Sequence, residues 1–146
     1  MSLSVEYPSR RQTLLAGFAE QNIDSLLITS SPNVRYLTGF TGSNGALFLT
    51  RGEAVLFTDP RYTLQAAEET SCRVRILTGP LIPGLVKALR RSRPGRLGFE
   101  KSQIAYFAWD YLNRESQGRY SLVPVDGLVE AQRMVKSEAE IAFIRA

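Results

Sequence analysis

Short apolar runs of strand length alternate along this chain with segments whose apolar residues have helical spacing. The strand-length runs lie at residues 25–29, 46–50, 54–58, 73–77, 96–99 and 120–123. Because a helix and a sheet must each bury an apolar face, this alternation favours a sheet with helices packed over it. The sequence therefore predicts one α/β domain, and 146 residues are enough to bury a single core.

The link between the second and third runs sets part of the sheet topology. Arg51-Gly52-Glu53 is a three-residue connection of hairpin length, so these two strands are expected to pair antiparallel. Strands that are joined through helices pair parallel instead. We therefore expect a mixed parallel and antiparallel sheet flanked by helices, in which residues 73–77 form an exposed-edge or half-buried strand.

Helices are expected around residues 9–21, 61–69, 82–89 and 104–112, and a helical turn at residues 33–37. Ser9 is the candidate N-cap of the first helix, Gly39 ends the short turn, and Pro60 fits a first helical turn after Asp59. The residues expected to face the core are Leu14, Leu15 and Phe18; Tyr62, Leu64 and Ala67; Ile82, Leu85, Val86 and Leu89; and Ile104, Phe107, Ala108, Tyr111 and Leu112.

The composition excludes several kinds of chemistry. The chain has no histidine, which removes Ser-His-Asp and Cys-His nucleophiles and every metal site that contains histidine. Its one cysteine, Cys72, excludes an internal disulfide and is expected to be a core thiol in a reducing compartment. No apolar run approaches the ~20 residues that cross a bilayer. We therefore expect a cytoplasmic domain with no membrane partner and few catalytic groups.

The carboxylates do not form a recognisable acid–base or metal motif. The candidates are scattered over separate predicted elements: Asp59, Glu68, Glu69, Glu100 and Asp110. Only Asp59 and Glu100 are expected near the ends of neighbouring strands, and two carboxylates are a weak basis for a metal site. We therefore expect no catalytic residue and no metal or other cofactor in this chain.

Two local motifs have both a structural and a functional interpretation. The glycine cluster at residues 39–45 lacks the spacing of a phosphate-binding loop and favours a turn before the strand at 46–50. Asp59-Pro60-Arg61-Tyr62 follows a strand, where Asp59 can cap the next helix and Tyr62 can pack in the core. The same position suits a ligand site, with Arg61 binding a carboxylate and Tyr62 forming a wall.

Arg90, Arg91, Arg93 and Arg96 form a basic run in a chain whose formal net charge is +4. The structural interpretation, that Arg90 and Arg91 end a helix where cations complement the dipole, is favoured over nucleic-acid binding. Near the carboxyl end, Ser137 and Glu140 have the spacing of a capping box, so a helix is expected to begin there. It reaches Ala146 after about two turns. This favours an amino-terminal piece of a longer protein over a natural frayed end.

Three stretches of the chain resemble one family. Residues 33–45 read NVRYLTGFTGSNG and are similar to the N-x-x-Y-L-T-G-F-x-G-S-x-G segment of Xaa-Pro aminopeptidases. Residues 57–62, FTDPRY, resemble their T-D-x-R-Y segment, and residues 133–146 resemble the helix that leads into their catalytic domain. The first two motifs are typical of the amino-terminal domain that Xaa-Pro aminopeptidases, prolidases and creatinases share.

The resemblance implies a non-catalytic creatinase/prolidase-type domain with a ribonuclease H-like α/β fold at residues 1–132, followed at residues 133–146 by the start of a linker helix. The linker would lead to an absent metallopeptidase domain that holds two divalent ions, manganese, cobalt or zinc. That domain would hydrolyse X–Pro bonds, either in dipeptides or in longer peptides, and the sequence of residues 38–45 favours longer peptides. The implied partners are this catalytic domain, a second subunit in a homodimer and a proline-containing peptide, with no nucleic acid.

The site residues also follow from the resemblance. Asp59, Arg61 and Tyr62 occupy the family's D-x-R-Y positions, and Tyr36 and Phe40 occupy the aromatic positions of the first motif. We expect Arg61 and the aromatic residues to face the active-site cleft while Asp59 holds Arg61 or caps its helix; internal scaffolding is the alternative. Two rival functions are a peptide- or histone-binding module of a pseudo-peptidase and a basic nucleic-acid-binding domain.

Overall fold

The computed structural model describes residues 6–146 and has the predicted mixed sheet. Its strands are β1 (Ser25–Ile28), β2 (Gly45–Thr50), β3 (Ala54–Thr58), β4 (Arg73–Ile76), β5 (Arg96–Glu100) and β6 (Ser121–Val125), in the order β4-β3-β2-β1-β5-β6. β2 is antiparallel to both of its neighbours, and the other pairs are parallel. The carboxyl ends of five strands therefore meet at one sheet edge, beside the start of β2.

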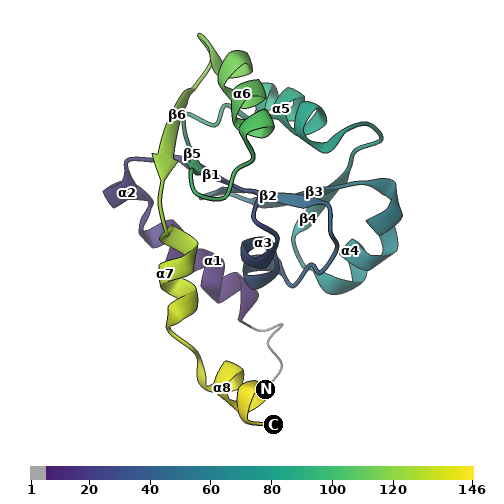
Figure 1. The fold of residues 1–146 in the computed structure, drawn as a ribbon, viewed down its shortest axis with the longest axis vertical. Helices are drawn as coiled ribbons and strands as arrows, with labels where there is room; N and C mark the ends of the chain where they lie inside the picture. Colours follow the sequence, from purple (N-terminus) through teal and green to yellow (C-terminus); the bar gives the residue numbers. More distant parts are fainter. Residues whose placement is uncertain (1–5) are drawn as a thin grey trace.

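Helices cover both faces of the sheet, as Figure 1 shows. The helices are α1 (Tyr7–Ala16), α2 (Phe18–Gln21), α3 (Ser31–Thr38), η2 (Pro60–Tyr62, a 3-10 turn), α4 (Thr63–Glu69), α5 (Leu81–Ser92), α6 (Tyr106–Ser116), α7 (Leu128–Met134) and α8 (Glu138–Arg145). α5 and α6 lie on one face, and α1, α3, α4 and α7 lie on the other (Figure 1).

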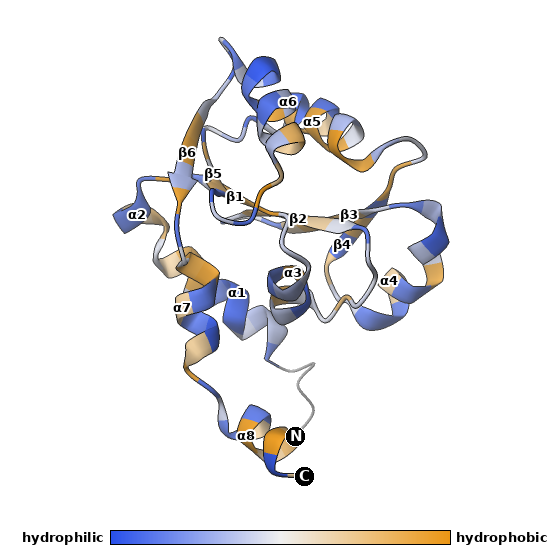
Figure 2. Cartoon of the chain, viewed as in Figure 1, coloured by the Kyte–Doolittle hydropathy of each residue, from blue (hydrophilic) through white to orange (hydrophobic). Residues whose placement is uncertain are grey.

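Two apolar clusters form the core, one on each side of the sheet. β1 shows why, since successive side chains of a strand point to opposite faces: Leu26 and Ile28 join the cluster under α1 and α3, and Leu27 joins the cluster under α5. Figure 2 shows the apolar strands at the centre of the layers. The buried residues of α5 are the predicted Leu85, Val86 and Leu89.

Most predicted elements are confirmed within a few residues, and the first helix is the main correction. α1 begins at Tyr7 with Glu6 as its N-cap, so Ser9 lies inside the helix rather than at its cap. The helix then breaks at Gly17, whose N–H bonds back to the carbonyl of Leu14. The predicted turn at 33–37 is the longer helix α3, and Gly39 ends it in a left-handed conformation with φ of 85°.

Three predicted core residues are exposed instead. Leu64 is 77% exposed, because the 3-10 turn η2 precedes α4 and it is Ala66 that faces the core. Ala67 is exposed on the same helix. Phe107 is 61% exposed, since α6 begins only at Tyr106 and its first turn lies beside a groove at the sheet edge.

The predictions for β4 and for the end of α5 are confirmed. β4 is an edge strand whose residues alternate between exposed and partly buried. Cys72, predicted as a core thiol, is instead only partly buried against the core, and this burial raises the pKa of its thiol. Arg90 and Arg91 lie in the last turn of α5, where Arg90 pairs with Glu115. Over residues 6–146 the longest apolar helical stretch falls short of what a bilayer crossing requires.

Candidate functional site

The Asp59-Pro60-Arg61-Tyr62 motif is a compact turn at the carboxyl end of β3. Asp59 caps η2, because its Oδ1 accepts the backbone N–H of Arg61 at 2.9 Å. The same carboxylate holds the guanidinium of Arg61, whose Nε lies 3.0 Å from Oδ1 and whose Nη2 lies 2.8 Å from Oδ2. Asp59 therefore performs both expected roles, as a cap and as the partner of Arg61.

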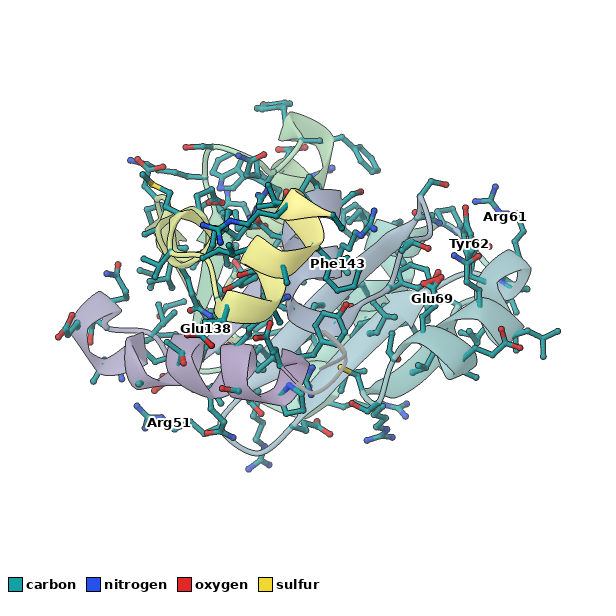
Figure 3. All side chains as sticks on the ribbon, turned by 90° about the horizontal axis from the view of Figure 1, so that it is seen from below. Arg51, Arg61, Tyr62, Glu69, Glu138 and Phe143 are labelled. Atoms are coloured by element: carbon teal, nitrogen blue, oxygen red, sulfur yellow. The ribbon has the colours of Figure 1, made fainter. Side chains whose placement is uncertain are left out.

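Asp59 is ionised in this turn, and the side chain of Arg61 remains accessible to solvent. Hydrogen bonds from the Arg61 side chain and from Asn44, whose Nδ2 lies 2.7 Å from Oδ2, hold the pKa of Asp59 well below its ordinary value. The Arg61 side chain is 69% exposed, and Figure 3 shows it at the rim of the molecule. A planar guanidinium held on one side in this way can bind a second anionic group on the other.

The glycine cluster folds around the ring of Phe40. Phe40 is buried, and a Cβ added at Gly45 would lie 2.8 Å from its Cε2 atom; one added at Gly42 would also collide with the ring. Glycine is required at these two positions because the loop passes directly against the ring. The loop is therefore a structural turn with an aromatic core, as its lack of phosphate-loop spacing predicts.

Tyr62 joins the loop to the turn. Its hydroxyl lies 2.6 Å from Oγ of Ser43 and accepts the Ser43 backbone N–H at 3.2 Å, and these hydrogen bonds lower the pKa of the phenol. Its ring meets Phe40 edge to face, with centroids 5.5 Å apart, and the Arg61 guanidinium carbon lies 5.2 Å from the ring centroid. Tyr62 therefore packs against the core and also presents a polar tip to the loop.

Glu69 holds the loop from α4, a role that the sequence reasoning did not assign. Its Oε2 accepts the backbone N–H of Thr41 at 2.7 Å, and its Oε1 accepts the Thr41 hydroxyl at 2.6 Å. Gln65 donates to the same hydroxyl and to Glu69. Figure 3 shows Glu69 on the same side of the molecule as Tyr62 and Arg61. The loop is thus fastened from both the η2 turn and α4.

Tyr36 lies apart from the other residues of the expected site. It is on α3, where its ring stacks on the guanidinium of Arg10 with 4.2 Å between the guanidinium carbon and the ring centroid. It lines a groove beside α7 and α8 rather than the loop. The structure therefore brings together Asp59, Arg61, Tyr62 and Phe40, while Tyr36 belongs to another part of the surface.

A groove of about 330 Å³ runs along the carboxyl edge of the sheet beside the loop. Ser43 and Asn44 line it on one side, and Pro83 of α5 and Phe107 of α6 line it on the other. Thr29, which follows the last residue of β1, also lines this groove, and its hydroxyl is buried and has no hydrogen-bond partner among residues 6–146. The groove therefore combines apolar walls with a few polar groups, a composition typical of small-molecule binding sites.

Asn33, the first residue of the resembling motif, is a buried link between elements. Its Nδ2 donates to Glu100 at 2.5 Å and to Glu130 at 2.6 Å, and its Oδ1 accepts from Arg133 at 2.9 Å. Glu100 also accepts the backbone N–H groups of the β1–α3 connection. Burial raises the pKa of Glu100, although these hydrogen bonds oppose the shift. Asn33, the first position of the motif, therefore has a structural role, because it links α3 to β5 and α7.

The donor set does not fit the two-metal centre that the resemblance associates with this family. The sequence has no histidine, and the described part of the chain contains no group of three or more Cys, Asp or Glu side chains placed to share an ion. Asp59 and Glu100, the two carboxylates near strand ends, are engaged separately by Arg61 and by Asn33. No step of a metal-dependent reaction is therefore assigned to these residues.

Comparison with known proteins identifies relatives of this chain in sequence and in structure. The creatinase/prolidase N-terminal domain family matches residues 10–135. The uncharacterized peptidase YqhT of Bacillus subtilis (strain 168) is 36% identical over 128 residues, which are 87% of this chain and 36% of YqhT. The N-terminal domain of the cytoplasmic peptidase PepQ from Mycobacterium tuberculosis H37Rv has a TM-score of 0.78 at 37% identity, covering 84% of this chain and 97% of that domain.

An Xaa-Pro dipeptidase from Bacillus anthracis has a TM-score of 0.86 at 27% identity, over 93% of this chain and 38% of that protein. The chain spans 36% or less of the length of the curated relatives YqhT, human Xaa-Pro aminopeptidase 2 and the Pyrococcus horikoshii Xaa-Pro dipeptidase. The family match covers most of the chain, and the mixed six-stranded sheet agrees with it. This chain belongs to the creatinase/prolidase N-terminal domain family.

Proposed function

We propose that this chain is the non-catalytic amino-terminal domain of an Xaa-Pro peptidase. Residues 1–132 form the domain and residues 133–146 begin the linker to a catalytic domain that hydrolyses X–Pro bonds with two divalent ions. Support comes from relatives named Xaa-Pro dipeptidase, of which this chain matches little more than a third. The carboxylates and the single cysteine of this chain do not fit a two-metal centre, so the proposal assigns the metal ligands to the catalytic domain. The parent is proposed to be a cytoplasmic homodimer.

The domain is proposed to form a wall of the active-site cleft and to contribute to the dimer. The observation that carries this proposal is the presentation of Arg61, which is held by Asp59 yet mostly exposed. Asn44, which donates to the same Asp59 carboxylate, lines the uncharged groove. Within residues 6–146 Nη1 of Arg61 makes no hydrogen bond, so it remains free to donate to a peptide carboxylate. Phe40 and Tyr62 support the loop behind it.

A chimaera tests this role directly. The amino-terminal part of the Bacillus anthracis Xaa-Pro dipeptidase is replaced by this chain, and hydrolysis of an X–Pro dipeptide is measured. Arg61→Ala is expected to raise KM by about tenfold, the effect of losing one charge-assisted hydrogen bond. Arg73→Ala is the matched control, because the Arg73 side chain is 66% exposed and pairs with Glu53 on the far edge of the sheet.

The outcomes separate the cleft wall from internal scaffolding. If Arg61→Ala leaves KM and kcat unchanged and lowers only the stability of the chimaera, the cleft role is wrong. Binding of peptides without any hydrolysis, in a parent that lacks the metal ligands, would identify the rival peptide-binding module. The nucleic-acid alternative has less support, since Arg90 pairs with Glu115 and Arg96 pairs with Asp24.

A further inference from the structure

The last helix, α8, is attached to the domain by polar contacts. It lies below the body of the domain in Figure 1, beyond the end of α7. No residue of α8 is buried, and Phe143 and Ile144 are 64% and 70% exposed. An eight-residue helix with no fully buried residue is too short to be stable by itself in water. Its fixed position therefore needs another source of stabilisation.

Arg10 of α1 supplies the contact between the domain and α8. Arg10 is only 9% exposed. Its Nη2 lies 2.9 Å from the carboxylate of Glu6 and 3.1 Å from that of Glu140 on α8. Its Nη1 donates to the carbonyl of Tyr36 at 2.8 Å. The rings of Tyr7 and Tyr36 stack on the guanidinium. One cation thus joins α1, α3 and α8.

The capping box of α8 is part of the same network. The Ser137 hydroxyl accepts the backbone N–H of Glu140 at 3.1 Å, and Glu140 Oε2 accepts the Ser137 N–H at 2.8 Å. Ser137 also donates to Glu6 at 3.1 Å, while the other oxygen of Glu140 pairs with Arg10. The two residues of the capping box are therefore also the two that bind α8 to Arg10 and to Glu6, the N-cap of α1.

We infer that Arg10 is a positioning residue that sets the direction in which α8 leaves the domain. This role of Arg10 follows from contacts within this chain. The further consequence, that Arg10 thereby places a following catalytic domain, rests on the proposed function. Arginine suits the position because its planar fork can bond two carboxylates and a carbonyl at once while its faces stack on aromatic rings. A lysine ammonium has no such planar geometry and is expected to replace it poorly.

Amide hydrogen exchange on this 146-residue chain tests the inference. Arg10→Met and Glu140→Gln are each expected to speed exchange of the α8 amides by about tenfold or more, with the strand amides of β1 and β5 changing far less. Glu140→Gln alters only an element at the end of the chain, so it remains informative if Arg10→Met folds poorly. Residual dipolar couplings of the α8 amides report direction and are expected to shrink in both variants.

Each variant has a matched control. Arg11→Met removes a neighbouring arginine of α1 whose Nη1 donates to the Leu37 carbonyl at 2.7 Å rather than to α8. Glu138→Gln removes an exposed carboxylate from the first turn of α8. Both controls are expected to leave the dipolar couplings of α8 unchanged. Arg10→Lys is expected to resemble Arg10→Met.

Three results would overturn the inference. One is α8 exchange in Arg10→Met at the rate seen in Arg11→Met. Another is loss of protection that is uniform over the chain, which would make Arg10 a general stability residue. The third is α8 exchange at unprotected peptide rates in the unmodified chain. Failure of the chimaera experiment with unchanged behaviour of α8 would refute the proposed function alone.

Discussion

Gly45→Ala tests whether the glycine loop takes its shape from the ring of Phe40. The added Cβ would lie 2.8 Å from Cε2 and 3.2 Å from Cδ2 of that ring. Ordinary carbon contacts are about 3.5–4.0 Å, so the two groups must separate by about 0.7 Å. Neither side moves freely, because Gly45 pairs with Thr58 in the sheet and Phe40 is buried against Tyr62.

The expected cost follows from this overpacking. Extra methyl groups in a well-packed site destabilise by about 1–3 kcal/mol, and we expect about 2 kcal/mol for Gly45→Ala. Phe40→Leu removes the Cε2 atom that the new methyl would strike, so Gly45→Ala should cost under about 1 kcal/mol in that background. The coupling between the two positions is then about 1–2 kcal/mol.

Urea unfolding of the two single variants and the double variant measures this coupling. Gly52→Ala is the control, since its added Cβ would meet only the Thr50 hydroxyl, at 3.9 Å. It is expected to change the free energy of unfolding by less than about 0.5 kcal/mol. Equal destabilisation by Gly45→Ala with and without Phe40→Leu would show that the ring does not shape the loop.

Three further predictions concern the core, a helix end and pH. Leu112→Ala, at a buried position, is expected to cost about 2–5 kcal/mol in urea unfolding, whereas Leu64→Ala at an exposed one should change stability by under about 0.5 kcal/mol. Gly39→Ala, at φ of 85° in a crowded site, should lower stability by more than about 1 kcal/mol, and Gly79→Ala, with open space around it, should be near neutral. Because the folded pKa of Glu100 is raised above its ordinary value of 4.5, the stability that this group contributes falls as pH rises above that value. Unfolding at several pH values should show wild type losing stability relative to Glu100→Gln between pH 4 and 7; a gain would contradict the reasoning.

Local patterns predicted most of the elements, and the errors have local causes. The hairpin of β2 and β3, the buried face of α5 and the capping box of α8 are confirmed, because each depends on residues close together in sequence. Leu64 and Phe107 were misjudged because helical spacing does not reveal where a helix starts relative to the sheet edge. α7 was missed altogether, although Val129 within it is buried.

The candidate site was predicted in part. Asp59 and Arg61 are two residues apart, so their pairing could be anticipated from the D-x-R-Y motif and ordinary capping chemistry. The contacts of Tyr62 with the loop and of Glu69 with Thr41 span 19 and 28 residues, and no local pattern predicts them. The grouping of Tyr36 with the other site residues was expected from the resemblance, and the structure places its ring on Arg10 instead.

The sequence by itself determined the α/β class, the mixed sheet and the family, because strand length, turn chemistry and short motifs are properties of adjacent residues. Only the tertiary structure decided which polar groups meet across the fold. Asn33 reaches Glu100 over 67 positions and Ser137 reaches Glu6 over 131, and such pairs form only once packing brings distant segments together. Burial then makes these contacts specific, since a polar group removed from water must find a partner inside the protein.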